Sequence, residues 1–222
     1  MPRQIVVSWS GGKDSALALH ELQQDPDWDV VGLLTSVTRG YDRVSIHGVR
    51  RSLLEAQARC LALPLFEIAL DPASSNEAYE AAFLGALGRI RRELPGVKHI
   101  AFGDLFLEDV RAYRERLLKG TGFEPVFPLW GKDTRELARK FIADGFVARL
   151  VCVDTTQLDA KFAGRAFDEA LLADLPPGVD PCGERGEFHT FVSDGPGFCE
   201  TIACAAGERV LRDERFMYCD VR

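Results

Sequence analysis

The sequence predicts an α/β protein: a parallel sheet with helices on both faces, followed by a smaller C-terminal α+β region. Short apolar runs alternate with amphipathic stretches through the first hundred residues, and this order favours right-handed crossovers between parallel strands. The last thirty residues change to short strand-like runs separated by turns. With 222 residues, 46% of them hydrophobic, the chain is long enough to bury a substantial core.

The first part of the chain is expected to contain four strands and four helices. Apolar runs of strand length lie at Ile5–Trp9, Trp28–Val37, Pro64–Leu70 and Val97–Phe102. Helical periodicity, with apolar residues three or four apart, covers Ala16–Gln23, Val49–Leu63, Asn76–Leu94 and Arg111–Lys119. A helix cap is expected among Ser74, Ser75 and Asn76, because such side chains accept hydrogen bonds from the first turn.

A change of pattern near residue 121 divides the chain into an N-terminal domain, residues 1–120, and a C-terminal region, residues 121–222. Gly120–Gly131 is expected to be a connection and Pro176–Gly186 to be irregular, because both are rich in glycine and proline. A helix is expected at Thr134–Ala143. Strands are expected at Val147–Val153, Glu187–Val192, Phe198–Cys204, Glu208–Leu211 and Phe216–Val221.

Charge and hydropathy argue against two classes of partner. The 27 basic and 34 acidic side chains leave a net charge of −7, which disfavours a sequence-independent grip on nucleic acid through phosphate neutralisation. The longest runs without a charged residue, Gln4–Gly12 and Val30–Thr38, cover nine residues each. A membrane-spanning helix needs roughly 20, so no membrane span is expected.

Cysteine usage and the start of the chain indicate a compartment. The apolar run after Met1 is too short for a secretory signal. The six cysteines are scattered without CxxC spacing, so we expect reduced thiols and no paired zinc ligands. The sequence therefore predicts a cytoplasmic protein.

The hexapeptide Ser10–Ser15, of sequence SGGKDS, lies between the first expected strand and the first expected helix. Ligands of open α/β sheets bind at the carboxyl ends of the strands. Two glycines allow close approach to the backbone, and the N-terminus of the following helix favours phosphate. The hexapeptide fits neither the Walker pattern nor GxGxxG. We expect a phosphate-binding turn; the alternative is an ordinary small and polar turn.

This hexapeptide resembles the signature of the PP-loop ATP pyrophosphatases. The resemblance implies a Rossmann-like domain of the adenine nucleotide alpha hydrolase type, with ATP and Mg²⁺ as cofactors. Enzymes with this loop cleave ATP between the α and β phosphates, leave AMP on a substrate oxygen and release pyrophosphate. A nitrogen or sulfur nucleophile then displaces the AMP.

A second segment, Asp180–Val192 with the sequence DPCGERGEFHTFV, resembles the C-terminal signature of the diphthine–ammonia ligase family, and Asp194–Phe198 continues it. Arg185 departs from the family, which usually carries a small or amide residue at that position. Shorter segments agree in order and spacing, so that the resemblance spans nearly the whole chain: His47-Gly48, Gln57-Ala58, Leu63-Pro64-Leu65, Gly103-Asp104, Arg111 to Glu115 and Pro128-Leu129-Trp130.

The family resemblance implies an AMP-forming amide ligase that adenylates a carboxylate and transfers ammonia or an amine. Its partners would be a small-molecule or modified-residue carboxylate and ammonia. Glu108–Glu115 looks closer to bacterial members than to the archaeal and eukaryotic enzymes, which amidate diphthine on an elongation factor; a bacterial source would lack that acceptor. The alternatives are ATP binding without turnover, and adenylation of an RNA base or of an acid in corrinoid metabolism. The nitrogen donor and the oligomeric state, a homodimer included, stay open.

The candidate site residues follow from the motifs and the resemblance. The catalytic candidates are Lys13, Asp14, Glu184, Glu187 and His189. The nucleotide is expected at Ser8, Ser10, Gly11, Gly12, Lys13, Asp14, Ser15, Ser36, His47, Gly103 and Asp104. The acceptor is expected to contact Arg111, Tyr113, Arg114 and Thr190. Mg²⁺ is expected at Asp14 and Asp104, because it takes oxygen ligands.

Each of these assignments has a plain structural alternative. Glu187 and His189 lie two residues apart, so a strand puts both on one face, either as proton acceptors for an amine or as part of a solvated polar strand. For Arg111 and Arg114 the alternative is a solvated helix face. Cys182 is expected to be a small buried cysteine and not a thiol nucleophile.

Overall fold

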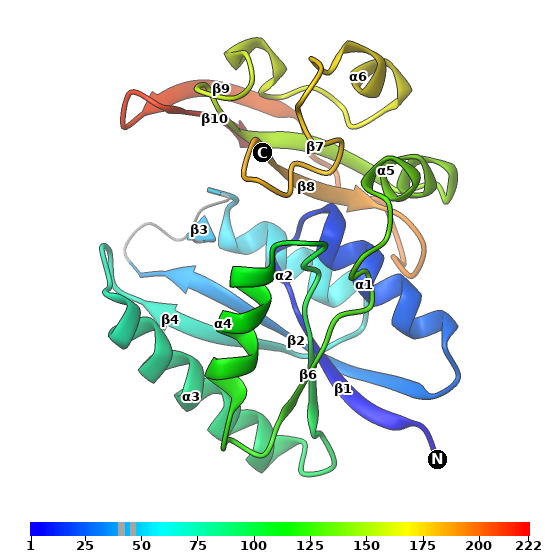
Figure 1. Ribbon diagram of the computed structural model, residues 1–222, viewed down its shortest axis with the longest axis vertical. Coiled ribbons are helices and arrows are strands. Elements are labelled where there is room, and N and C mark those ends of the chain that lie inside the picture. The colour runs from blue at the N-terminus through cyan, green and yellow to red at the C-terminus, as the bar shows by residue number, and fades with distance from the viewer. Residues whose placement is uncertain (40–42, 45–47) are drawn as a thin grey trace.

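The computed structural model describes residues 1–39, 43–44 and 48–222, and it contains two sheets of unequal size (Figure 1). The larger sheet, in the lower half of Figure 1, is built from the N-terminal strands, and the smaller one, in the upper half, from the C-terminal strands. This arrangement confirms the expected α/β class with a smaller C-terminal α+β region. His47, an expected nucleotide-binding residue, lies outside the described residues.

The larger sheet is parallel apart from one short strand. β3, Arg43–Val44, pairs antiparallel with the end of β2. The side chains of Ile5, Val6 and Val7 in the central strand β1 are 0% exposed, as expected for a parallel strand covered on both faces. The parallel strands lie side by side in the order β4 (Leu65–Leu70), β2 (Trp28–Thr38), β1 (Arg3–Ser8), β5 (His99–Ala101) and β6 (Glu124–Val126).

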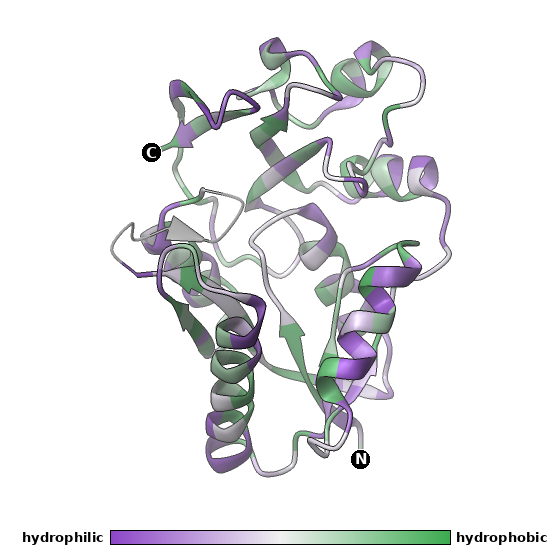
Figure 2. Cartoon of the chain, turned by 60° about the vertical axis from the view of Figure 1, so that its left-hand side comes forward, coloured by the Kyte–Doolittle hydropathy of each residue, from purple (hydrophilic) through white to green (hydrophobic). Residues whose placement is uncertain are grey.

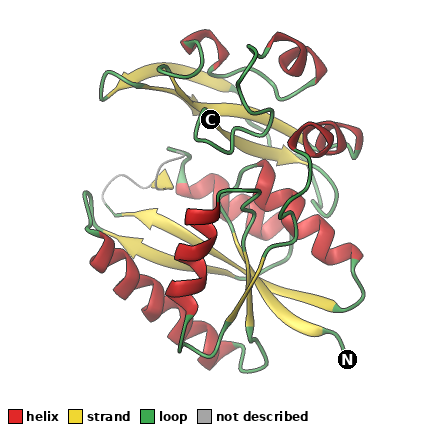
Figure 3. Cartoon of the chain, viewed as in Figure 1, coloured by secondary structure: helices red, strands yellow, loops and turns green. Residues whose placement is uncertain are grey.

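Helices cover both faces of this sheet, as Figure 3 shows. Ile5 and Val7 share a core with α1 and α2, whereas Val6 shares a core with α3 and α4. This division follows from the alternation of side chains along a strand. The four helices are α1 (Lys13–Gln24), α2 (Arg51–Cys60), α3 (Asn76–Glu93) and α4 (Glu108–Leu118).

The smaller sheet is antiparallel and packs on the side of the larger sheet that carries α1 and α2. Its apolar residues belong to the same buried cluster as those two helices, and in Figure 2 many segments of the strands carry the hydrophobic colour. The strands lie in the order β8 (Phe188–Asp194), β7 (Val147–Asp154), β10 (Phe216–Val221) and β9 (Ala206–Arg212). The accompanying helices are α5 (Thr134–Ala143), α6 (Glu169–Asp174) and the 3₁₀ helix Ala160–Phe162.

Local signals located most elements to within a few residues. Ser75 caps α3 by accepting a hydrogen bond from the Ala78 N–H at 3.3 Å, which confirms the expected cap. Asp133 caps α5 in the same way. Among the described residues, no helix is long and apolar enough to cross a bilayer.

Other expectations were wrong. No strand forms at 198–204: the segment between β8 and β9 is irregular, and the Ile202 N–H donates to the Ser193 carbonyl oxygen. The expected connection at 120–131 contains β6, which pairs with β5 in the larger sheet. Between β7 and β8, the 3₁₀ helix and α6 were not expected. The division of the chain at residue 120 stays a prediction.

Candidate active site

The SGGKDS turn joins the end of β1 to the start of α1. Gly11 adopts φ +78°, a conformation that glycine reaches without strain. The Gly12 N–H donates to the Ser10 hydroxyl at 3.3 Å, and the Ser15 hydroxyl donates to the Gly12 carbonyl oxygen at 2.8 Å. The hydroxyl oxygens of Ser10 and Ser15 lie 3.2 Å apart. The two serines therefore hold the turn in shape at the N-terminus of α1.

Lys13 is buried, with 2% of its side chain exposed. Its Nζ donates to both carboxylate oxygens of Asp14 at 2.8 Å and to the carbonyl oxygen of Cys182. Burial by itself lowers the pKa of Lys13, but the attractions of Asp14, Cys182 and Glu184 together outweigh it, so the pKa lies above its ordinary value. The loop of β1 is thus tied to the C-terminal segment by a charged ammonium group.

The segment Asp180–Glu187 folds around two buried carboxylates. Asp180 accepts hydrogen bonds from the Cys182 N–H at 2.8 Å and from the Thr134 hydroxyl at 2.8 Å. Glu187, 2% exposed, accepts from the Asp180 N–H through one oxygen and from the Arg185 N–H through the other, both at 2.9 Å. The bonds from the Asp180 and Cys182 N–H groups satisfy backbone donors that burial would otherwise leave unpaired.

This geometry corrects the expected place of Glu187. Both of its carboxylate oxygens face its own loop, and Glu187 does not line the cavity described below. His189, two residues along β8, does line that cavity. The shared strand face that the sequence predicts therefore does not bring the two side chains to one site.

Glu184 has the carboxyl group best suited to proton transfer. Burial raises its pKa to about 7; a hydrogen bond from the Leu105 N–H at 2.8 Å opposes the rise, and the charges of Asp14 and Asp104 add to it. Such a group exchanges a proton readily near neutral pH. Burial also raises the pKa of Asp14 and of Asp104, against the opposing effects of Lys13 and Arg114.

These groups meet at a cavity of about 250 Å³ between the SGGKDS turn, the end of β5 and the start of β8. It brings together most of the residues that the sequence singled out. Its lining includes Ser8, Ser10, Gly12, Lys13, Asp14, Ser15, Gly103, Asp104, Arg114, Glu184, His189 and Thr190. Gly11, Ser36, Arg111, Tyr113 and Glu187 do not line it.

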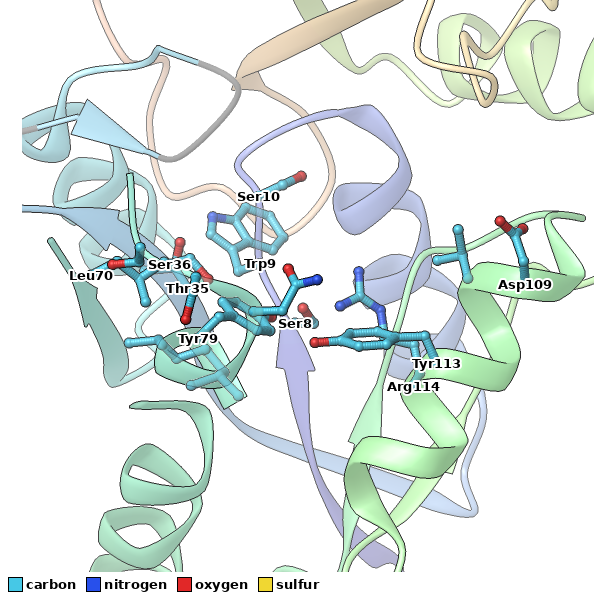
Figure 4. A pocket seen from close by; sticks show the side chains of 16 residues that line it. Ser8, Trp9, Ser10, Thr35, Ser36, Leu70, Tyr79, Asp109, Tyr113 and Arg114 are labelled. Carbon is cyan, nitrogen blue, oxygen red and sulfur yellow. The ribbon is translucent and has the colours of Figure 1, made fainter. Parts of the chain in front are cut away.

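A second cavity of about 570 Å³ adjoins the first and shares Ser8, Ser10 and Arg114 with it. Figure 4 shows Thr35 and Ser36 on one side, Tyr113 and Arg114 of α4 on the other, and Ser8 between them. Ser36 and Tyr113 were expected at the site. Thr35, Trp9, Asn76 and Tyr79 also line this cavity and were not expected, because nothing in their local sequence marks them.

Arg114 lies at the junction of the two cavities. Its Nε is 3.5 Å from a carboxylate oxygen of Asp104, and its guanidinium lies 5.0 Å from the centre of the Phe102 ring. Arg111, one helical turn away, instead pairs with Glu115 at 2.9 Å and lies over the Trp130 ring. The structure therefore brings only Arg114 of the two arginines to the cavities.

Gln57 is buried. The family resemblance includes it only as part of the segment Gln57-Ala58, without a role. Its Nε2 donates to the carbonyl oxygens of Gly11 at 3.0 Å and Val192 at 2.6 Å, and its Oε1 accepts from the Trp9 indole at 2.9 Å. The Val192 N–H also donates to the Gly11 carbonyl oxygen at 2.9 Å. Gln57 therefore fixes the SGGKDS turn to both α2 and β8.

The residues present fit a nucleotide and a magnesium ion. Among the described residues, the Thr35 hydroxyl is the buried side-chain polar atom without a hydrogen-bond partner, and it lies at the larger cavity. A Cβ atom on Gly12 would come within 2.9 Å of the Thr190 carbonyl oxygen, and one on Gly103 within 2.9 Å of the Asp14 backbone, so these glycines let the SGGKDS turn pack closely against β8 and the end of β5. The Asp14 and Asp104 carboxylates supply the oxygen donors that Mg²⁺ takes.

The Cys182 thiol does not have the properties of a nucleophile. It is 1% exposed, and burial raises its pKa to about 12. Its Sγ lies 3.3 Å from the Thr134 carbonyl oxygen. Because the thiolate is the reactive form, the expectation of a small buried cysteine is confirmed.

Comparisons with known proteins agree with this geometry. The family model of the diphthamide synthase N-terminal domain matches residues 3–125, and that of the C-terminal domain matches residues 133–222. The diphthine–ammonia ligase of Homo sapiens is 28% identical over 91% of this chain and 83% of its own length. That of Danio rerio is 25% identical over 95% and 90%.

A longer relative shows the same relationship. The diphthine–ammonia ligase of Schizosaccharomyces pombe is 24% identical over 90% of this chain, which corresponds to 36% of the relative. The two family models together leave unmatched only residues 1–2 and 126–132 of this chain. The chain therefore belongs to the diphthamide synthase family, a family of ATP-dependent carbon–nitrogen ligases.

Proposed function

We propose that this protein adenylates a carboxylate with ATP and releases pyrophosphate, and that ammonia or an amine then displaces AMP from the carboxylate to form an amide. The observation that carries the proposal is the pair of joined cavities around the SGGKDS turn. One cavity has the size and the lining for a nucleoside, and the other gathers carboxylates, an imidazole and a buried ammonium. The names of the relatives suggest diphthine as the model for the acceptor.

The larger cavity suits the nucleoside part of ATP. Its polar and apolar walls match a base and a ribose, and the Thr35 hydroxyl gains the hydrogen-bond partner that it lacks. The phosphates then reach the SGGKDS turn, where the backbone N–H groups at the start of α1 favour anions. Arg114, at the junction of the cavities, stabilises the charge that builds on the leaving pyrophosphate.

The smaller cavity, which the SGGKDS turn lines, is where the phosphates meet the acceptor carboxylate and the nitrogen nucleophile. Glu184, with a pKa of about 7, accepts the proton that the amine loses as it attacks the adenylated carboxylate. His189 lines the same cavity and orients the nucleophile. Mg²⁺ bound at Asp14 and Asp104 would neutralise charge on the phosphates.

Lys13 acts mainly by position in this scheme. Its ammonium group is held by Asp14 and the Cys182 carbonyl oxygen, so it keeps the C-terminal segment against the nucleotide site. It also keeps positive charge beside the cavity that its side chain lines. Removal of this group would therefore disturb both the phosphate site and the segment that carries Glu184.

Product analysis tests the proposal. Purified protein is incubated with Mg²⁺-ATP and ammonium, with and without a diphthine-containing peptide or a metabolite extract. We expect AMP and pyrophosphate to form only when the acceptor is present. Because Arg114 stabilises charge on the leaving group in this proposal, Arg114→Ala should lower the rate of AMP formation by at least about 100-fold. The matched control is Lys119→Ala, an exposed cation at the end of α4, which should keep the parental rate.

Two outcomes would contradict the proposal. ADP and phosphate as products would show cleavage at the γ-phosphate, which the site is not proposed to support. Tight ATP binding with no AMP in the presence of every acceptor would show a nucleotide-binding protein without turnover.

A further inference from the structure

A cluster of two thiols and a carboxylate lies away from the proposed active site, at the far end of α2. It consists of Cys60, the last residue of α2, and of Cys199 and Glu200 in the irregular segment between β8 and β9. The two Sγ atoms and a carboxylate oxygen all lie within 4.8 Å of one another. Cys60 is buried, whereas Cys199 and Glu200 are exposed.

We propose that Cys60, Cys199 and Glu200 bind a divalent cation of the zinc class, which fastens the segment before β9 to α2. Thiolates are the preferred ligands of soft and borderline cations, and a carboxylate completes many such sites. Tetrahedral zinc with Zn–S bonds of about 2.3 Å places its sulfur ligands about 3.8 Å apart, within the spacing found here. The exposed fourth position is left to water.

The backbone already holds the two cysteines in register. The Cys199 N–H donates to the Cys60 carbonyl oxygen at 3.0 Å, so no large movement is needed to close the ligand set. The cluster also lies at the C-terminus of α2, where the helix dipole favours a positive charge. Without a cation, burial, Cys199 and Glu200 together raise the pKa of the Cys60 thiol.

The site has a mechanical consequence for the SGGKDS turn. Cys60 lies one helical turn after Gln57, whose amide holds Gly11 and Val192. A cation at Cys60 would fix the end of the helix that carries this amide. The segment before β9 has little secondary structure of its own, so a metal ligand set is an effective way to order it.

A cobalt titration of the full-length, reduced and metal-free protein tests the proposal. We expect one Co²⁺ per chain with thiolate-to-cobalt charge-transfer absorption, and displacement of that absorption by Zn²⁺. Cys60→Ser and Cys199→Ser should each lose the absorption. Cys204→Ser, a cysteine of the same segment that is not in the cluster, should keep it and serves as the matched control.

Thermal unfolding supplies an independent readout. Zn²⁺ at about 100 times its dissociation constant should raise the Tm of the parent by about 5–10 °C, and this rise should vanish in Cys199→Ser. Because Cys199 is exposed, this variant should fold like the parent, and far-UV circular dichroism checks that it does. Thiolate ligation displaces protons, so the apparent affinity should increase with pH.

Three results would overturn the proposal. The first is the absence of charge-transfer absorption in the reduced parent. The second is an absorption that persists in both Cys60→Ser and Cys199→Ser. The third is protein in which air oxidation removes two titratable thiols by a Cys60–Cys199 disulfide, and which binds no metal after reduction.

Discussion

The side-chain amide of Gln57 donates a hydrogen bond to the backbone oxygen of Gly11, 3.0 Å away, across 46 positions of the sequence. The same nitrogen donates to Val192 on β8. This buried amide therefore helps to fix how the SGGKDS turn lies relative to the C-terminal sheet, together with the bond from the Val192 N–H to the Gly11 carbonyl oxygen.

Gln57→Leu tests this role. The substitution keeps the volume but leaves the Trp9 indole and the Val192 carbonyl oxygen without their Gln57 partners. We expect a loss of about 2–4 kcal/mol in the free energy of unfolding, measured by urea denaturation, together with weaker ATP binding. Arg59→Gln, on the exposed side of α2, should change stability by less than about 0.5 kcal/mol. Equal effects of the two substitutions would refute the role.

Thr35→Val separates binding from stability. The substitution keeps a β-branched side chain and removes the unpartnered hydroxyl, so stability should stay the same or rise. ATP affinity should fall about fivefold to tenfold, as for the loss of one hydrogen bond, when measured by calorimetry. Thr38→Val, at the end of the same strand, is the control. Unchanged ATP affinity in Thr35→Val would remove this hydroxyl from the nucleotide site.

Glu184 should control the pH dependence of amide formation. Its carboxylate form accepts the proton, so with free amine held constant the rate should rise as pH passes through about 7, the pKa of Glu184. Glu184→Gln should lose this rise and most of the activity. Glu108→Gln, an exposed carboxyl at the start of α4, should keep the parental profile. If the rate of Glu184→Gln still rose with pH through about 7, the group that controls the pH dependence would be a residue other than Glu184.

The same shift makes a prediction about stability. The folded-state pKa of Glu184 lies above the ordinary value of 4.5, so the folded protein holds the proton more tightly than the unfolded chain. Stability from this group is fully present below pH 4.5 and is lost as pH rises through about 7. Relative to Glu184→Gln, the parent should therefore become less stable from pH 4.5 to 7 in urea titrations. If the difference in the free energy of unfolding between the parent and Glu184→Gln stayed the same from pH 4.5 to 7, the raised pKa of Glu184 would be contradicted.

Glu187 should prove a positioning residue. Glu187→Ala leaves the buried N–H group of Asp180 and the partly buried N–H group of Arg185 without their carboxylate, so we expect a loss of about 3 kcal/mol in stability and a lower rate of AMP formation. The pH at which the remaining activity rises should stay near that of the parent, because Glu184 is retained. Glu208→Gln on the exposed strand β9 is the control. A shifted pH profile with normal stability would instead place Glu187 in the chemistry.

Local patterns predicted the elements that depend on neighbouring residues. The alternation of apolar runs and amphipathic stretches located α5 and β10 with their observed bounds, and Ser75 was among the expected caps. The strand expected at 198–204 does not form, since that segment makes isolated backbone hydrogen bonds, to Ser193 of β8 and to Cys60 of α2, and no continuous ladder with either element. Ile202 of this segment is buried by packing and not by sheet pairing.

The candidate site divides in the same way. The SGGKDS turn was recognisable because glycine conformation and the helix N-terminus are local properties. The place of Glu187 could not be recognised from the sequence. Its residue type and its spacing from His189 are the same whether its side chain faces the cavity or its own loop. Thr35 carried no signal at all, since a threonine in a strand is ordinary until burial removes its partners.

The sequence by itself determined the alternation of strands and helices, the SGGKDS turn between the first strand and the first helix, and the family-specific segment near the C-terminus. Only the tertiary structure decided that Lys13 bonds the Cys182 carbonyl oxygen 169 positions away, that Glu184 lies deep enough for its pKa to reach about 7, and that Cys60 meets Cys199. The physical reason is the distance along the sequence over which each property is determined. Propensity and periodicity depend on residues a few positions apart, whereas burial and charge coupling depend on which distant segments the folded chain brings within a few ångströms.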